Sequence, residues 1–248
     1  MRPRAKTSVL GSDLGIATPV PKSDLRIREE DTQLHRYILP RGIEGEYQPG
    51  SRRRVLRNLL GLRAKTEIDA AENAAFGAVQ ERYYTDGFIT AETRFTAEIL
   101  KRMHEDWLGN IYAWAGEYRT VDMSKGDFVF PPAYLISTNM ERFEKEVLAA
   151  HTPCRPRELS EVCHALAVVH GELLLIHPFR EGNGRLARWV ANLMAVQAGF
   201  PAPKYGLVGR GSKLAGQQYL GAVIRAYKGD YVELSDFFTR SLGRRLGG

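Results

Sequence analysis

A short run of residues between two predicted helices combines side chains suited to phosphoryl chemistry. The run is His177-Pro178-Phe179-Arg180-Glu181-Gly182-Asn183-Gly184-Arg185, followed by Arg188. Gly182, Asn183 and Gly184 tolerate tight backbone geometry and place unpaired N–H groups at the start of a helix, where the helix dipole favours an anion. The segment therefore predicts a seat for a phosphate group.

Charged side chains flank this seat. Arg185 and Arg188 lie one turn apart on the same side of the predicted helix, so their guanidinium groups can hold successive phosphates. Glu181 supplies a hard oxygen ligand for Mg²⁺, although a carboxylate here can also serve as a helix cap. His177 is the candidate base, because an imidazole with a pKa of about 6.5 can take a proton from a hydroxyl near neutral pH. The pattern indicates nucleotidyl or phosphoryl transfer by positioning and charge neutralisation.

The elements around the run are predicted to be helical. Apolar residues recur at helical spacing over residues 66–84, 90–110, 134–150, 158–176, 186–197 and 214–227. The helix before the run must end near His177, because Pro178 disfavours the α conformation in the residue before it. His170, seven residues earlier, is predicted to be a core histidine.

One hairpin interrupts the helices. Tyr118–Met123 alternates as a strand does, Ser124–Asp127 supplies the turn, and Phe128–Phe130 returns before two prolines. We expect an all-α protein with one β-hairpin, in which residues 1–53 form a partly irregular N-terminal arm and residues 54–248 form the main domain.

Composition excludes several classes of protein. The 248 residues are 44% hydrophobic and 26% charged, which is typical of a globular domain. The longest apolar stretch is interrupted at residues 170–172, so we expect no membrane span, and the absence of a secretory signal favours the cytoplasm. Cys154 and Cys163 are expected to be reduced structural thiols. The net charge is +6, but the basic run Arg52-Arg53-Arg54 with Arg57 lacks interleaved aromatic residues, so nucleic-acid binding is not expected.

The run His177–Arg188 resembles the signature of the Fic family, His-Pro-Phe-x-(Asp or Glu)-Gly-Asn-Gly-Arg-x-x-Arg, with every fixed position filled. The hairpin with Lys125-Gly126 resembles the flap of that family, and the resemblance extends over about residues 54–238. It implies a Fic-type helical core that uses MgATP to transfer AMP to a Tyr, Thr or Ser hydroxyl of a target protein, with release of pyrophosphate.

The resemblance also implies roles for individual residues. His177 would deprotonate the target hydroxyl, Glu181 would hold Mg²⁺, and Phe179 would anchor the loop. The phosphates would be bound by Gly182, Asn183, Gly184, Arg185 and Arg188. In the flap, Lys125 and Gly126 would lie at the nucleotide edge, although Lys125 is equally compatible with an ordinary turn, and the target would pair with the edge at Phe128–Phe130.

Two alternatives stay open. Fic relatives with the same motif transfer UMP, phosphate or phosphocholine, or remove AMP; Gly184 favours adenylylation, because the phosphorylating group resembles this motif with lysine at that position. The other alternative is a catalytically silent binding module.

The resemblance also bears on regulation. In many relatives a glutamate pairs with the second motif arginine, which is Arg188 here. We expect that glutamate to come from a small antitoxin-like protein or from Glu44 or Glu72.

Overall fold

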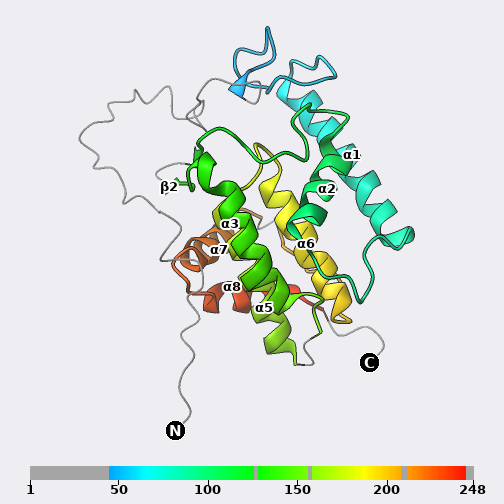
Figure 1. The fold of residues 1–248 in the computed structure, drawn as a ribbon, viewed down its shortest axis with the longest axis vertical. Helices are drawn as coiled ribbons and strands as arrows, with labels where there is room; N and C mark the ends of the chain where they lie inside the picture. The colour runs from blue at the N-terminus through cyan, green and yellow to red at the C-terminus, as the bar shows by residue number, and fades with distance from the viewer. Residues whose placement is uncertain (1–44, 126–127, 156–157, 208–211, 244–248) are drawn as a thin grey trace, which may run out of the picture.

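A computed structural model describes residues 45–125, 128–155, 158–207 and 212–243. These residues form a helical body with one two-stranded sheet, β1 (Ser124–Lys125) and β2 (Phe128–Val129) (Figure 1). The helices are α1 (Lys65–Thr85), α2 (Ala97–Leu108), α3 (Ile136–Arg142), α4 (Ala149–His151), α5 (Leu159–Ile176), α6 (Asn183–Gln197), α7 (Ser212–Ala226) and α8 (Val232–Ser241). A 3₁₀ turn, η4 (Ala133–Leu135), precedes α3, and a π-helical stretch, η5 (Phe143–Leu148), joins α3 to α4. The predicted all-α class with one hairpin is confirmed.

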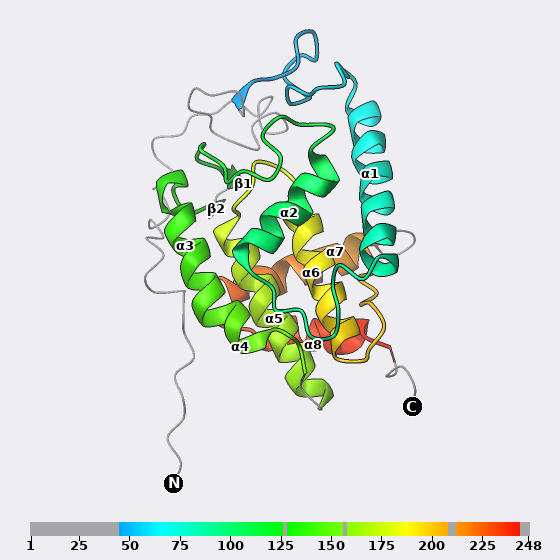
Figure 2. The same cartoon turned by 45° about the vertical axis from the view of Figure 1, so that its right-hand side comes forward.

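Helix α5 is the centre of the core. It packs against α6, α7 and α8, and the chain leaves its C-terminal end directly into the motif loop (Figure 2). By length and composition alone α5 is apolar enough to cross a membrane, but 78% of its residues are buried inside the protein, as in a core helix. Its apolar character has a simple cause, because a helix surrounded by other helices has no face left for polar residues.

An aromatic cluster fixes α6 against α1 and α2. The Phe76 ring lies 4.7 Å from Trp107 and 5.6 Å from Trp189, centroid to centroid, and Tyr83 lies 4.8 Å from Trp189. Trp107 and Trp189 are almost fully buried. These contacts hold the helix that carries the motif arginines in one orientation.

Two helices differ from the sequence expectation. Helix α2 begins at Ala97 and not at Thr90, because Thr90 and Thr93 hydrogen-bond within a turn and Thr96 caps the helix by accepting from the Ile99 N–H at 3.2 Å. Helix α8 was missed altogether. Its buried residues Leu234, Phe237, Phe238 and Ser241 have the helical spacing that a longer reading would have detected.

The hairpin is shorter than predicted. Residues 118–123 are irregular, and the strands are only Ser124–Lys125 and Phe128–Val129, paired antiparallel. The expected strand is replaced by hydrogen bonds of the Arg119 side chain, which take up the backbone oxygens of Val121 and Pro131.

The N-terminal region is described only in part. Residues 1–44 lie outside the described residues, and with them Glu44. Residues 45–64 form turns, with one antiparallel bridge between Tyr47 and Leu56, and Val55 is buried in the core. The basic residues Arg52, Arg53, Arg54 and Arg57 are exposed, as expected, although they lie in a turn and not at a helix edge. The boundary between residues 53 and 54 stays a prediction.

Candidate functional site

The motif loop forms one wall of a cavity of about 380 Å³. The loop and the first turns of α6 contribute His177, Glu181, Gly182, Asn183, Gly184, Arg185 and Arg188. The opposite wall is α7, with Tyr219, Leu220, Val223, Ile224 and Tyr227, and the hairpin contributes Lys125, Phe128 and Phe130. The cavity therefore has a polar end, at the start of α6, and an apolar side suited to a planar ring.

His177 ends helix α5 in an unusual conformation. Its φ of +52° and ψ of +58° are in the left-handed region, which costs a residue with a Cβ about 1 kcal/mol or more. Its backbone N–H still donates to the Leu173 carbonyl at 3.1 Å. The turn directs the chain away from α5 and places the imidazole on the cavity wall.

The protonation state of His177 follows from its partners. Nδ1 lies 3.1 Å from the Leu174 carbonyl oxygen, which can only accept, so Nδ1 carries the hydrogen and Nε2 is left bare. Burial lowers the pKa of His177 to about 3, the charges of Arg119 and Lys125 act in the same direction, and the bond to Leu174 acts against them. At neutral pH the imidazole is therefore neutral, the form that accepts a proton.

Two residues hold His177 in place: Arg119, to which the sequence interpretation gave no role, and Phe130, which it assigned to the target-binding edge but which is buried here. The Phe130 ring stacks on the imidazole with centroids 3.8 Å apart. Arg119, which is 2% exposed, donates Nε to the His177 carbonyl at 2.7 Å and Nη2 to the Pro131 carbonyl at 2.6 Å, while its backbone N–H donates to the Pro178 carbonyl. One buried guanidinium thus joins the motif loop to the hairpin.

The loop after His177 is closed by Asn183. The Asn183 Oδ1 accepts the Phe179 N–H at 2.9 Å, and Nδ2 donates to the Phe179 carbonyl at 2.6 Å. Phe179 is fully buried, as the sequence predicts. The Asn183 side chain is thereby engaged with the loop backbone, so its direct contribution to an anion would come from its backbone N–H at the start of α6.

His104 of α2 is a second support that sequence analysis missed. Its Nδ1 accepts the Gly116 N–H at 2.9 Å, and its Nε2 lies 3.1 Å from the Glu181 carbonyl oxygen, so the hydrogen is on Nε2. The ring stacks on Phe179 at 4.0 Å. Burial lowers the pKa of His104 to about 4. This neutral histidine fixes the loop backbone at Glu181 and Phe179.

Of the two motif glycines at the start of α6, only Gly182 lies where a side chain would not fit. Gly182 is the residue before the helix, with φ of +83°, and a Cβ there would lie 2.7 Å from Trp107. Gly184 has an ordinary φ, and a Cβ there would meet only Arg188 Nη1, at 3.5 Å. Helix α6 begins at Asn183, three residues earlier than predicted, so the N–H groups of its first turn face the cavity end, where an anion is favoured.

Glu181 fits the role of a magnesium ligand. One carboxylate oxygen, Oε1, accepts the Gly182 N–H at 2.9 Å and lies 3.6 Å from Arg185 Nη2, and the half-exposed side chain lines the cavity. A single carboxylate beside a phosphate seat suits Mg²⁺, which usually takes one or two carboxylates, substrate phosphates and water. Within the described part of the chain, no group of three or more His, Cys, Asp or Glu side chains could hold a metal ion alone.

The two motif arginines have different surroundings. Arg185 donates Nη2 to Glu72 of α1 at 2.5 Å, and its guanidinium lies 4.5 Å from the Trp107 ring centroid. Among the ion pairs of the described residues Arg188 has no carboxylate partner. The sequence interpretation offered Glu72 as a partner for Arg188, and the structure corrects this: Glu72 pairs with Arg185.

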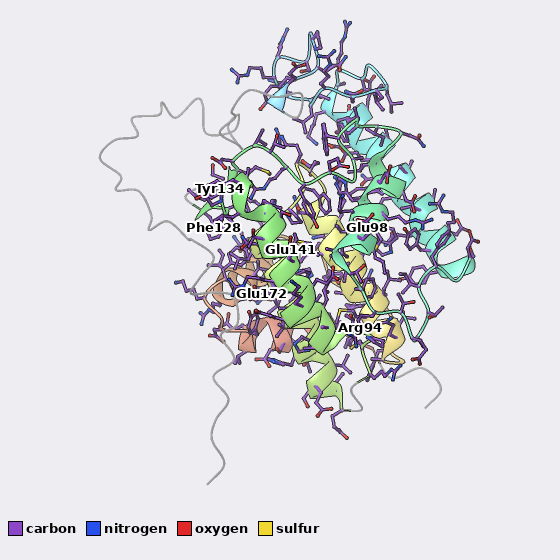
Figure 3. The ribbon with its side chains drawn as sticks, viewed as in Figure 1. Arg94, Glu98, Phe128, Tyr134, Glu141 and Glu172 are labelled. Carbon is purple, nitrogen blue, oxygen red and sulfur yellow. The ribbon has the colours of Figure 1, made fainter. Side chains whose placement is uncertain are left out.

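The hairpin lies beside the cavity. Lys125 and Phe128 line the cavity, and Phe128 lies 4.8 Å from the Tyr227 ring. Gly126 lies outside the described residues. Val129 is 46% exposed and Tyr134 82% exposed, and Figure 3 shows Phe128 and Tyr134 at this end of the protein.

The predictions for His170 and the two cysteines are confirmed. His170 is buried in the core, and both cysteines are free and buried.

Comparisons with known proteins agree with this geometry. Residues 94–195 match the model of the Fic/DOC family. The chain is 30% identical over 146 residues to the protein adenylyltransferase VbhT of Bartonella schoenbuchensis, which is 59% of this chain and 30% of VbhT. It is 26% identical over 181 residues to the probable protein adenylyltransferase y4lH of Sinorhizobium fredii, which is 73% of this chain and 88% of y4lH. The chain thus spans less than a third of VbhT and most of y4lH.

Solved structures share the fold. The BepC protein of Bartonella tribocorum, crystallised with AMPPNP, superposes with a TM-score of 0.63 at 19% identity, over 82% of this chain and 98% of that one. An N-terminal Fic domain from Bartonella quintana, crystallised with ADP, gives 0.63 at 18% identity, over 80% and 94%. At these identities the likeness establishes the fold.

Proposed function

The chain carries a domain of the Fic/DOC family, and on this premise we propose that it transfers AMP from MgATP to a Tyr, Thr or Ser hydroxyl of a target protein, with release of pyrophosphate. One observation carries the proposal: His177, whose ring is neutral and whose Nδ1 is engaged with Leu174, lines the cavity whose polar end is the start of α6. A proton acceptor and an anion seat thus face one space.

In the proposed reaction His177 accepts the proton, and the start of α6 binds the phosphates. The target oxygen attacks the α-phosphorus, its proton passes to His177 Nε2, and the bond to pyrophosphate breaks. The left-handed turn, the Phe130 stack and the Arg119 clamp hold the imidazole in place before substrate binds. Because negative phosphates favour the imidazolium, a bound nucleotide would raise the pKa of His177 and strengthen it as a base.

The phosphates would lie on the N-terminal turn of α6. Its backbone N–H groups and the Arg188 guanidinium face the negative charge that shifts toward pyrophosphate. Glu181 would hold Mg²⁺, which when bound supplies further neutralisation of the phosphates. The apolar wall of α7, with Val223 and Ile224, would contact the base.

For the target we propose an extended segment that pairs with the hairpin edge. The strand Phe128–Val129 adjoins the cavity, and exposed side chains of Val129 and Tyr134 flank it. An edge of this kind reads backbone shape more than side chains. An inhibitory glutamate directed at Arg188 is proposed to come from a separate antitoxin-like protein, because Glu72 is engaged with Arg185.

Donor competition tests the chemistry. Purified protein is incubated with a cell lysate, Mg²⁺ and α-labelled ATP, and excess unlabelled ATP, UTP or CDP-choline is added in parallel. We expect only unlabelled ATP to abolish protein labelling. No label from α-labelled ATP, together with label from α-labelled UTP or choline-labelled CDP-choline offered in its place, would favour a relative that transfers UMP or phosphocholine. Labelling that survives every competitor would contradict a nucleotide transferase.

A further inference from the structure

His104 of α2 is hydrogen-bonded at both ring nitrogens, and each bond goes to the backbone of a different loop. Nδ1 accepts the Gly116 N–H at 2.9 Å, so the ring hydrogen is on Nε2, which donates to the Glu181 carbonyl oxygen at 3.1 Å. The side chain is fully buried, and its ring stacks on Phe179 with the planes at 8° to each other. The direction of the Nε2–H donor is therefore fixed on both sides.

The Glu181 carbonyl belongs to the same peptide unit as the Gly182 N–H. This unit is planar and trans, so its C=O and N–H point in opposite directions. His104 donates to the C=O, and the N–H donates to Oε1 of the Glu181 side chain at 2.9 Å. One rigid plane thus connects the His104 ring to the Glu181 carboxylate.

The glycine after this plane would allow the plane to flip. Glycine accepts φ of either sign, so the peptide unit before it can rotate as a whole, and Gly182 has φ of +83°. A flip would turn the N–H away from Oε1 and put a carbonyl oxygen in its place, which repels the carboxylate. The bond from His104 opposes the flip, because a flipped unit would leave a buried Nε2–H without its acceptor.

We propose that His104 is a positioning residue that holds the peptide unit between Glu181 and Gly182 in the orientation that presents the Glu181 carboxylate to Mg²⁺. This inference rests on the proposed function, in which Glu181 holds the cation. The loss of a partner that orients a metal ligand typically costs about 10- to 100-fold in metal affinity or activity. His104 should therefore act on the Mg²⁺-dependent part of nucleotide binding and leave the rest unchanged.

Two replacements of His104 separate its two hydrogen bonds. The amide of His104→Gln ends near the Nε2 position and keeps a donor for Glu181, whereas the shorter amide of His104→Asn ends near the Nδ1 position and keeps only an acceptor for Gly116. Calorimetry on the full chain measures the Kd of AMPPNP with Mg²⁺ and with EDTA, and the ratio of the two Kd values is the gain from Mg²⁺.

We expect His104→Asn to reduce the gain from Mg²⁺ about 10-fold and His104→Gln to keep it within about 3-fold. The Kd in EDTA should stay within about 2-fold of the parent value in both variants. Three results would each overturn the inference: a full gain in His104→Asn, an equal loss of affinity with Mg²⁺ and with EDTA, or a parent protein that gains nothing from Mg²⁺.

A double variant shows whether His104 acts through Glu181. In a Glu181→Gln protein the ligand carboxylate is already absent, so His104→Asn should reduce the remaining gain from Mg²⁺ by less than about 2-fold. A further reduction of about 10-fold would contradict positioning through Glu181.

If His104→Asn does not fold, the tautomer of His104 in the parent protein provides the test. Nitrogen NMR distinguishes a ring nitrogen that carries hydrogen from a bare one, and spectra of His104→Gln identify the resonances. The inference requires hydrogen on Nε2 and a bare Nδ1. Hydrogen on Nδ1 would leave no donor for the Glu181 carbonyl and would overturn it.

These measurements need no acceptor protein. If the parent and the two variants show the expected Mg²⁺ effects but the parent labels no target, the proposed transfer fails while the role of His104 stands. If the parent labels a target but His104→Asn keeps the full gain from Mg²⁺, the positioning role alone fails.

Discussion

Glu72 of α1 accepts a hydrogen bond from Arg185 of α6 at 2.5 Å, and the same carboxylate accepts the Tyr112 hydroxyl at 2.6 Å. Glu72 is 4% exposed, and its backbone oxygen also accepts the Trp107 Nε1–H. The ion pair between Glu72 and Arg185 links α1, which lies outside the motif, to α6, which carries the motif arginines. Arg185 is thus part of the fold as well as of the cavity wall, whereas Arg188 has no carboxylate partner among the ion pairs of the described residues.

Removing either member of this pair should destabilise the protein. Glu72→Gln leaves a largely buried guanidinium with only the more distant carboxylate of Glu181, 3.6 Å away, and Arg185→Gln leaves a buried carboxylate without its cation. We expect each to lower the free energy of unfolding by about 2 kcal/mol, and the double variant by clearly less than the sum. Urea denaturation of the four proteins measures this. Additive losses would mean that the two side chains do not interact.

The same Glu72→Gln variant tests internal inhibition. Because Glu72 contacts Arg185 and not Arg188, we expect its self-labelling from α-labelled ATP to stay at or below the level of the parent. A several-fold increase in self-labelling would show that Glu72 restrains the site.

The two glycines of the motif should respond differently to alanine. At Gly182 a Cβ would lie 2.7 Å from Trp107 and the backbone has a positive φ, so Gly182→Ala should lower Tm by more than about 5 °C. At Gly184 the nearest atom is the flexible end of Arg188, so Gly184→Ala should keep the Tm of the parent. Thermal unfolding followed by circular dichroism compares them, and equal Tm values for both variants would contradict the geometry.

Glu172 should make stability depend on pH. Burial raises its pKa to about 7 from an ordinary 4.5, while the Tyr231 hydroxyl and the Arg142 charge act against this. Between these pH values the folded protein keeps a proton that the unfolded chain releases, so stability falls as pH rises toward 7.

Glu172→Gln stays neutral and removes this effect. We take the free energy of unfolding of Glu172→Gln minus that of the parent, each measured by urea denaturation. We expect this difference to be about 2 kcal/mol more favourable to the variant at pH 8 than at pH 5. His151 and His164, which line the same small cavity, are present in both proteins and cancel in the comparison. The same difference at both pH values would show that Glu172 is ionised normally.

His177 should not titrate near neutral pH in the nucleotide-free protein. Its pKa of about 3 keeps the ring neutral from pH 5 to 8, so its NMR shifts should be constant over that range. Spectra of His177→Ala identify the resonances. Addition of AMPPNP should raise the pKa, because phosphate charge favours the imidazolium. A titration centred near 6.5 without nucleotide would contradict the enclosure of the ring.

Local patterns were enough to predict much of this protein. The motif residues form one wall of one cavity, α5 ends at Ile176 with His177 as its cap, and the predicted helical class is confirmed. These features depend on residues close together in the chain. The start of α2 and the hairpin were predicted less well, since Thr96 competes with Thr90 as a cap and the Arg119 side chain takes up backbone oxygens that a strand would use.

The supports of the site could not be predicted from spacing. Arg119 and His104 each reach the motif from a distant part of the chain and look like ordinary surface or core residues in the sequence. Their partners are mostly backbone groups, which leave no pattern of side chains to detect. Only the folded chain brings them together.

Parallel labelling with α-labelled and γ-labelled ATP tests the central claim most directly. Parent and His177→Ala proteins are each incubated with Mg²⁺ and a cell lysate, and label retained on protein is measured after denaturation. We expect label from the α position only, and its loss in His177→Ala although that variant still binds AMPPNP. Retention of γ label, or undiminished α label in His177→Ala, would contradict AMP transfer with His177 as its base.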